Sequence, residues 1–267
     1  MQIESIPSWQ LPAGVSPGTW DYAARPAIAT EYDQYFADHP LFALDQQLVL
    51  RHLPPPDSQG RTTVADLGCG TGRALVALAA SGYRGLAIDL SQHMLEVVQQ
   101  KTQTQALPIA SVRANLVDLN GIADNCVEHA VSLFSTLGMI RGRANRIAAL
   151  GHTRRILKPG GKFVLHVHNI WSSLYDPAGL RWLCRSWWSS RKRGDQEFGD
   201  RVYQYRGLPN MFLHNFGLSE LKSDLRQAGF EVEQIFPLNL TASGVLPLRR
   251  VLPRVRAGGF VAVCRRD

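Results

Sequence analysis

Short apolar runs and stretches of helical spacing alternate through the middle of the chain. Between Thr63 and Val167 the helical stretches lie at about 71–80, 91–102 and 141–157, each between apolar runs of strand length. Such alternation predicts a parallel sheet wound with right-handed crossovers. We therefore expect an α/β fold with a doubly wound sheet, whose ligands bind at the carboxyl ends of the strands.

The flanking segments depart from this rhythm. Residues 1–20 predict an irregular arm, and residues 32–53 a helix that ends before the break at 54–60. Residues 169–216 mix tryptophan with arginine and predict a short helix and a β-hairpin turned at 208–210. A helix from Gly217 or Ser219 to Ala228 and strands near 231–236 and 259–264 resume the pattern. We predict an N-terminal arm and helix at 1–53 and a domain at 54–267, with a cap inserted at about 169–216.

Residues 64–72 read Val-Ala-Asp-Leu-Gly-Cys-Gly-Thr-Gly, an apolar strand that ends in an acid and three alternating glycines before a helix. Glycine tolerates positive φ and lets the backbone approach a ligand, while the free N–H groups of the following helix attract polar atoms. A second apolar strand ends in Asp89, where an acid accepts hydrogen bonds from ribose hydroxyls. An ordinary glycine turn explains the first feature alone, but the pair predicts a cofactor with a free ribose.

The glycine register distinguishes two classes of cofactor. A dinucleotide fingerprint requires glycine at the sixth position of the loop, where this chain has Arg73, so nicotinamide and flavin are disfavoured. The run Asp66-Leu67-Gly68-Cys69-Gly70-Thr71-Gly72, together with Asp89, closely resembles the first two motifs of class I S-adenosylmethionine-dependent methyltransferases.

The resemblance continues in three later segments. Residues 114–119 correspond to the segment that binds the adenine amino group, with Asn115 in place of the usual acid. Residues 127–134 resemble the fourth strand, residues 134–138 the loop at the methionine end, and residues 157–165 the turn into the fifth strand. The resemblance implies a Rossmann-like sheet of seven strands with the last strand antiparallel, and S-adenosylmethionine as cofactor. The cofactor-binding residues that it implies are Asp66, Gly68, Cys69, Gly70, Thr71, Gly72, Asp89, Leu90, Asn115, Leu116, Phe134 and Ser135.

Methyl transfer needs few specialised side chains, because a sulfonium already has a good leaving group. The protein must align the acceptor, exclude water and, for a protonated acceptor, remove a proton. His168, at the end of the fifth strand, is our candidate general base or acceptor-orienting residue; a packed histidine bonded to backbone is the alternative. The candidate acceptor-binding residues are Thr136, Asn169, Trp171, Tyr203 and His214.

Composition adds expectations about size, metal and compartment. The chain has 267 residues, 45% of them hydrophobic, which suits one elaborated domain with a substantial core. The four cysteines form no CxxC pair, and no cluster has metal-ligand spacing, so we expect neither a disulfide framework nor a bound metal. Without a long apolar stretch or a signal sequence, we expect a soluble cytoplasmic protein with no membrane partner.

The net charge does not identify the methyl acceptor. The formal charge is +7, with arginine clusters at 141–146, 154–158, 249–256 and 265–266. Our first hypothesis is a small-molecule methyltransferase whose cap closes over the acceptor. The second is an RNA methyltransferase, because residues 203–221 loosely resemble a stretch of enzymes that methylate the modified wobble uridine of tRNA. The third is a non-catalytic cofactor-binding module. The sequence does not indicate an oligomeric state.

Overall fold

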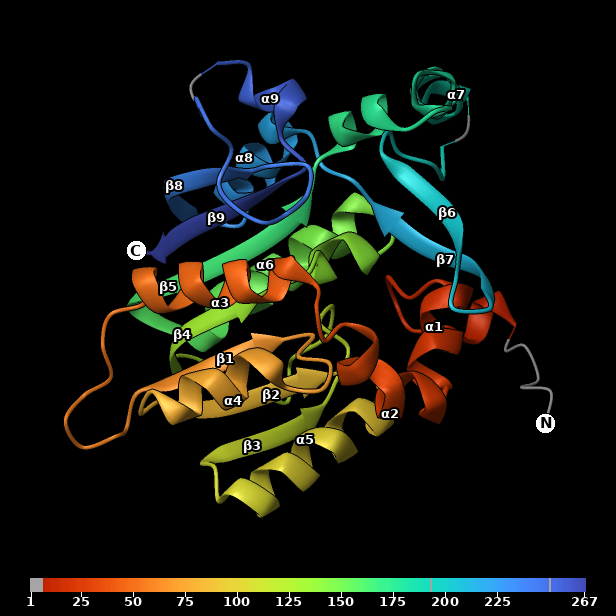
Figure 1. The fold of residues 1–267 in the computed structure, drawn as a ribbon. Helices are drawn as coiled ribbons and strands as arrows, with labels where there is room; N and C mark the ends of the chain where they lie inside the picture. Colours follow the sequence, from red (N-terminus) through yellow and green to blue (C-terminus); the bar gives the residue numbers. More distant parts are fainter. Residues whose placement is uncertain (1–6, 193, 250) are drawn as a thin grey trace.

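A seven-stranded sheet forms the centre of the computed structural model, which describes residues 7–192, 194–249 and 251–267. The strand order is β3-β2-β1-β4-β5-β9-β8 (Figure 1). Strands β1 to β5 are parallel, and β9 is antiparallel to both neighbours, β5 and β8. The bounds are β1 Thr63–Leu67, β2 Arg84–Asp89, β3 Ile109–Arg113, β4 Val127–Ser132, β5 Leu157–His168, β8 Phe230–Leu238 and β9 Gly259–Arg266. The predicted sheet is confirmed, including its antiparallel last strand.

Helices cover both faces of the sheet, because most of its strands are apolar on both sides. On one face, α3 (Pro40–His52), α4 (Arg73–Ala80) and α5 (Gln92–Gln105) bury leucines and valines in one core cluster. On the other, α6 (Arg143–Ile156) and α8 (Leu218–Gln227) pack into a second cluster. Helices α4, α5, α6 and α8 were predicted from the sequence, and their bounds lie within three residues of the expected ones.

The N-terminal segment is more regular than its composition predicts. The short 3-10 helix η1 (Ser8–Gln10) and the start of helix α1 (Pro17–Ala24) lie in the irregular arm expected at 1–20, and helix α2 (Pro26–Tyr35) follows. The single helix expected at 32–53 is wrong, because the chain breaks after α2 and starts again at Pro40. Proline has no N–H to continue a helix but fits the first turn of a new one, and each of these three helices begins with proline.

The segment after β5 contains the 3-10 helix η3 (Ile170–Tyr175), helix α7 (Gly179–Lys192) and a hairpin of β6 (Asp200–Tyr205) and β7 (Leu208–His214). The hairpin turns at Arg206 and Gly207, not at 208–210 as expected, and both turn residues have positive φ. Two such residues match the twist of the strands, so Pro209 and Asn210 lie within β7. Figure 1 shows the hairpin beside α1, with α7 standing away from the sheet.

Two short elements complete the chain: η2 (Thr136–Met139) follows β4, and α9 (Pro253–Arg256) precedes β9. Arg193 and Arg250, which belong to the basic segments noted above, lie outside the described residues. No helix in the described ranges is long and apolar enough to cross a bilayer.

Candidate active site

The glycine turn after β1 is fixed to β2 by backbone hydrogen bonds. The amides of Gly68 and Cys69 both donate to the carbonyl of Ile88, at 2.8 and 3.1 Å. Gly68 has a φ of +77°, and a Cβ there would lie 2.2 Å from Thr136 Cγ2. A Cβ on Gly70 would lie 4.0 Å from the Tyr32 ring, its nearest neighbour, so the backbone at Gly70 borders open space. A ligand can therefore approach the main chain closely at Gly70.

Two acids, the buried Asp66 and the half-buried Asp89, lie beside this turn. Asp89 accepts hydrogen bonds from the Gly70 amide at 2.9 Å and from the Ser91 amide at 2.8 Å. Burial raises the pKa of Asp89, although these amides oppose the shift. Burial and the nearby charge of Asp89 raise the pKa of Asp66 to about 8. Both acids line the same cavity, which therefore favours a ligand with hydroxyl donors or positive charge.

The N-terminal helices are fastened to the glycine turn by polar contacts. Thr71 donates its hydroxyl to Asp33 Oδ1 at 2.6 Å, and Lys101 forms an ion pair with Asp33 Oδ2 at 2.5 Å. Lys101 also donates to the Thr71 carbonyl, and Ser91 donates its hydroxyl to the carbonyl of Ala23. The arm that we expected as a separate segment thus forms part of the site wall. Nothing in the local sequence marks Asp33, because its partners lie 38 and 68 residues further along the chain.

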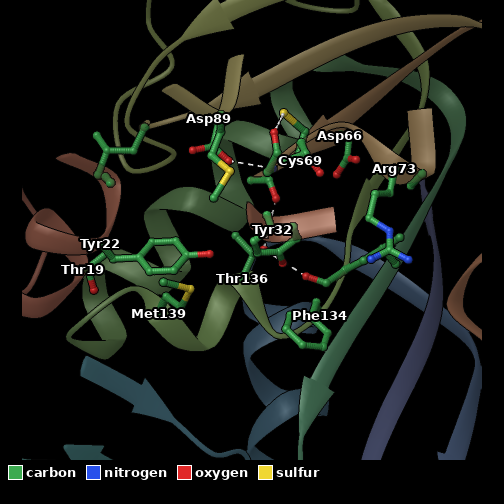
Figure 2. A pocket seen from close by; sticks show the side chains of 18 of the residues that line it. Thr19, Tyr22, Tyr32, Asp66, Cys69, Arg73, Asp89, Phe134, Thr136 and Met139 are labelled. Carbon is green, nitrogen blue, oxygen red and sulfur yellow. Dashed lines mark hydrogen bonds between the residues drawn. The ribbon is translucent and has the colours of Figure 1, made fainter. Parts of the chain in front are cut away.

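A cavity of about 540 Å³ extends from the glycine turn toward the hairpin. Figure 2 shows Asp66, Cys69 and Asp89 on one side of it and Tyr22, Phe134 and Met139 on the other. Ten of the twelve predicted cofactor residues line this cavity: Asp66, Gly68, Cys69, Gly70, Thr71, Asp89, Leu90, Asn115, Leu116 and Phe134. Among the residues predicted for catalysis and the acceptor, His168, Thr136 and Tyr203 line it.

The remaining predicted site residues lie outside the cavity wall. Gly72 is the N-cap of α4, and the buried Ser135 accepts the His168 amide on its hydroxyl at 3.2 Å. Asn169 donates its side-chain amide to the carbonyls of Arg254 and Ala257. The Trp171 ring lies 6.3 Å from that of Phe198, and His214 is held between Asp200 and Glu220, each at 2.8 Å. Since their polar groups already have partners, we assign Ser135, Asn169 and His214 to support of the surrounding loops.

Asn115 lines the cavity but has local partners as well. Its amide nitrogen donates to the Ala13 carbonyl at 2.9 Å, and its oxygen accepts from the Val117 amide at 3.1 Å. A side-chain carbonyl oxygen has two lone pairs, so one remains available for an amino group.

The end of the cavity away from Asp66 is aromatic, and sequence reasoning missed most of this wall. Phe42 stacks on Phe134 with ring centroids 4.9 Å apart, and Phe36 packs edge-on against Phe134 at 5.2 Å. The Arg73 guanidinium lies 3.8 Å from the centroid of Phe42 and packs against this wall. Arg73 is the residue at the sixth loop position, where a dinucleotide fingerprint would require glycine. Further wall residues are Tyr22, Tyr32, His39, Met139, Tyr205 and Met211. The i, i+4 spacing of Tyr32 and Phe36 was a signal in the sequence for part of this wall, although Phe36 is the C-cap of α2 and His39 the N-cap of α3.

Two polar groups lie at this aromatic end. Burial, together with His166 and His39, lowers the pKa of His168 to about 3. The His168 imidazole is therefore neutral at physiological pH and can accept a hydrogen bond. Asp45, on α3, lines the cavity and pairs through Oδ2 with His166 Nδ1 at 2.9 Å. Its other oxygen, Oδ1, is buried and finds no partner among the described residues.

One cluster of side chains outside the cavity has the spacing of a metal site. Ligand atoms of Glu197, Asp200 and His214 lie within 4.8 Å of one another. Glu197 Oε2 lies 2.5 Å from Arg146 Nη2, and its Oε1 accepts from the Arg143 amide. Both nitrogens of His214 also contact carboxylates. These atoms are engaged in an internal ion network, so we do not assign a metal to them.

Comparisons with known proteins find similar methyltransferases. The family model described as a methyltransferase domain matches residues 64–161. A putative methyltransferase of Geobacillus sp. (strain WCH70) is 28% identical over 145 residues, which are 54% of this chain and 57% of that protein. The chain therefore spans about half the length of the curated relatives that it matches.

Two solved structures share the fold at low sequence identity. One is a S-adenosylmethionine-dependent methyltransferase from Methanosarcina mazei, with a TM-score of 0.64 and 18% identity over 82% of this chain and 96% of that one. The other is the 1,6-didemethyltoxoflavin N1-methyltransferase of Burkholderia thailandensis, with bound 1,6-didemethyltoxoflavin and S-adenosylhomocysteine. Its TM-score is 0.58, with 17% identity over 97% of this chain and 93% of that one. Residues 64–161 therefore match a methyltransferase domain, and the sheet order and these two structures show that the chain has the fold of S-adenosylmethionine-dependent methyltransferases.

Proposed function

We propose that the chain transfers the methyl group of S-adenosylmethionine to a small, largely apolar acceptor that carries a hydroxyl or amino group. The observation that carries the proposal is the cavity itself. Asp66 and Asp89 line it beside the glycine turn, and its other end is the aromatic end described above. The N-terminal helices and the hairpin cover this aromatic end, which therefore suits a compact acceptor of this kind.

The residues at the glycine turn fit the cofactor. Asp89 would accept hydrogen bonds from the ribose hydroxyls, and the open backbone at Gly70 leaves room for close approach. Asp66 would face the positive charge of the methionine portion, because a carboxylate with a pKa of about 8 gains most from a neighbouring cation. Phe134 and Leu90 would supply apolar contacts to the cofactor.

When bound, S-adenosylmethionine supplies an electrophilic methyl group, and the remaining tasks fall to the chain. The aromatic wall would exclude water and hold the acceptor in line with that methyl group. His168 would accept a hydrogen bond from the acceptor and direct its lone pair, since its imidazole stays neutral. The unpartnered oxygen of Asp45 would take a second hydrogen bond or the released proton. We therefore assign His168 to positioning of the acceptor instead of to general-base catalysis.

The distribution of basic residues favours a small acceptor over RNA. Many basic residues noted in the sequence have acidic partners and would need to exchange them to bind phosphates. These pairs are Arg141 with Asp195, Arg143 with Asp224, Arg146 with Glu197, Arg155 with Asp124, Lys158 with Glu128 and Arg265 with Glu231.

The proposal is tested by incubating the purified chain and methyl-labelled S-adenosylmethionine with two fractions of a cell extract. One fraction holds metabolites below the size of a protein, and the other holds total RNA. We expect S-adenosylhomocysteine to accumulate, and label to enter a small molecule, only with the metabolite fraction. Asp89→Ala serves as the control that should lose both signals. Label that enters RNA alone would support the RNA alternative, and no turnover with either fraction would support a non-catalytic module.

A further inference from the structure

A second cavity lies away from the cofactor site, between η3, the first turns of α7 and strand β6. Its volume is about 360 Å³, and it shares no wall residue with the first cavity. A volume of this size falls within the range of small-ligand sites. The residues around it are Ser173, Asp176, Ala178, Gly179, Arg181, Trp182, Arg185 and Arg201.

Positive charge gathers at this cavity. Three arginines, Arg181, Arg185 and Arg201, line it together with a single acid, Asp176. Asp176 pairs with Arg201 at 3.2 Å, and within the described ranges neither Arg181 nor Arg185 has an acidic partner. Arg181 and Arg185 are four residues apart on α7, so the two positive charges repel one another across one turn of helix. An anion in the cavity would relieve this repulsion.

An unpartnered buried hydroxyl supplies a second, independent observation. Ser173 is 2% exposed, and its Oγ has no hydrogen-bond partner among the described residues. A buried hydroxyl without a partner is costly, and such groups in native structures commonly face a ligand or water. Ser173 belongs to the wall of this cavity, and its covered Oγ would have to turn toward the cavity to donate to an anionic oxygen bound there.

Trp182 adds a flat apolar surface to the same wall. Its ring already lies 5.4 Å from the guanidinium carbon of Arg201. A flat group on a ligand can pack against this indole while the arginines hold its charge.

From these features we propose that the cavity binds a small organic phosphate, a phosphomonoester on a flat apolar group. A phosphomonoester has three terminal oxygens and two negative charges, and planar guanidinium groups bind such oxygens in pairs. Arg181 and Arg185 would hold the phosphate, Ser173 would donate to one oxygen, and Trp182 would pack on the apolar group. Neither the cofactor nor the acceptor site takes part in this binding.

Phenyl phosphate is a suitable probe, and calorimetry with the full chain measures its binding. We expect saturable binding that weakens at least about tenfold in Arg181→Gln/Arg185→Gln. The matched control is Arg191→Gln/Lys192→Gln, which removes the same charge from the same helix. Arg191 and Lys192 lie over the rings of Trp187 and Trp188 and do not line the cavity, so this variant should bind within about twofold of the parent.

Ser173→Ala separates a binding role from a structural one. The hydroxyl has no protein partner, so its removal should leave the melting temperature of the free chain unchanged or higher. Phenyl phosphate binding should still weaken about three- to tenfold, which a purely structural role would not produce.

The probe set also identifies the source of the phosphate. Phenol and inorganic phosphate should each bind more weakly than phenyl phosphate. Vesicles with phosphatidylglycerol and a short single-stranded RNA should bind weakly and should not distinguish the two double variants. The proposal fails if the parent binds no phenyl phosphate while still binding S-adenosylhomocysteine. It also fails if both double variants lose affinity equally, or if vesicles or RNA bind more tightly than phenyl phosphate and depend equally on both basic pairs.

Discussion

Asp66 shows how a single buried residue can couple cofactor binding to pH. Its pKa of about 8 means that the carboxyl group is mostly protonated at pH 7 in the free chain. A cationic cofactor favours the ionised form, so the pKa of Asp66 falls on binding and a proton is released. We expect affinity for S-adenosylmethionine to rise between pH 6 and 8 and to level off above 8. Calorimetry at pH 7 in buffers of different ionisation enthalpy should show close to one proton released, and Asp66→Asn should release none.

Asp89 gives a prediction that concerns affinity alone. Asp89→Ala removes the carboxylate assigned to the ribose and also frees the amides of Gly70 and Ser91. We expect cofactor binding to weaken by about 1.5 to 3 kcal/mol, the usual contribution of hydrogen bonds to a charged group. Calorimetry with S-adenosylhomocysteine measures the loss. An unchanged affinity would refute the ribose assignment, and circular dichroism shows whether the variant has kept its fold.

His168 is predicted to act without changing its protonation state. Because its pKa is about 3, the rate between pH 6 and 9 should show no step that belongs to this residue. His168→Asn keeps a hydrogen-bonding side chain and should retain more activity than His168→Leu, for which we expect kcat/KM to fall about ten- to hundredfold. The measurement is kcat/KM against pH for all three proteins. An inflection near pH 6 that disappears in both variants would restore the general-base assignment.

At the scale of elements, the turn between β1 and α4 depends on close contact with η2. In Gly68→Ala the new methyl group would meet Thr136 Cγ2 at 2.2 Å, at a residue with a φ of +77°. We expect a loss of about 2 kcal/mol or more in the free energy of unfolding, measured by urea denaturation, from strain and steric overlap together. Gly151→Ala is the control, because Gly151 lies inside α6 with nothing within 4 Å of its Cβ position. That substitution should stabilise by about 0.5 to 1 kcal/mol. Equal stability of the two variants would contradict the close contact.

The elements that the sequence predicts well are those with a local cause. The apolar runs that became β1, β2 and β4 and the helices between them follow from periodicity, and the turn around Gly70 follows from composition. Pro40 could have indicated the start of a new helix, but the helical spacing on both sides of it led us to predict one continuous helix. The turn at Arg206 and Gly207 was missed because Pro209 and Asn210 are stronger turn formers. The aromatic end of the cavity could not be predicted as a whole, since it joins residues of α2, α3 and the hairpin that are far apart in the sequence.

At the scale of the molecule, a buried ion network joins the hairpin to the sheet domain. His214, at the end of β7, contacts Asp200 of β6 and Glu220 of α8. Burial alone would lower the pKa of His214, but the hydrogen bonds to Asp200 and Glu220 outweigh it and raise the pKa above its ordinary value. A charged His214 can donate from both ring nitrogens. Arg146 of α6 completes the network through Glu197 and Glu220. The same hairpin supplies Tyr203, Tyr205 and Met211 to the cavity, so this network positions part of the cavity wall.

Arg146 is the residue on which this connection most depends, because its side chain is fully buried between two carboxylates. In Arg146→Met, Glu197 and Glu220 lose their buried counter-ion, and such a loss typically costs about 3 to 5 kcal/mol of unfolding free energy. Arg141→Met provides the matched control, since Arg141 is 45% exposed and pairs with the exposed Asp195, which predicts a loss of about 0 to 1 kcal/mol. Urea denaturation measures both values. Hydrogen exchange should also accelerate across residues 200–214 in Arg146→Met alone, because α6 would no longer hold the hairpin. If exchange there is unchanged, the hairpin is held by its apolar contacts, and this part of the cavity wall does not depend on the ion network.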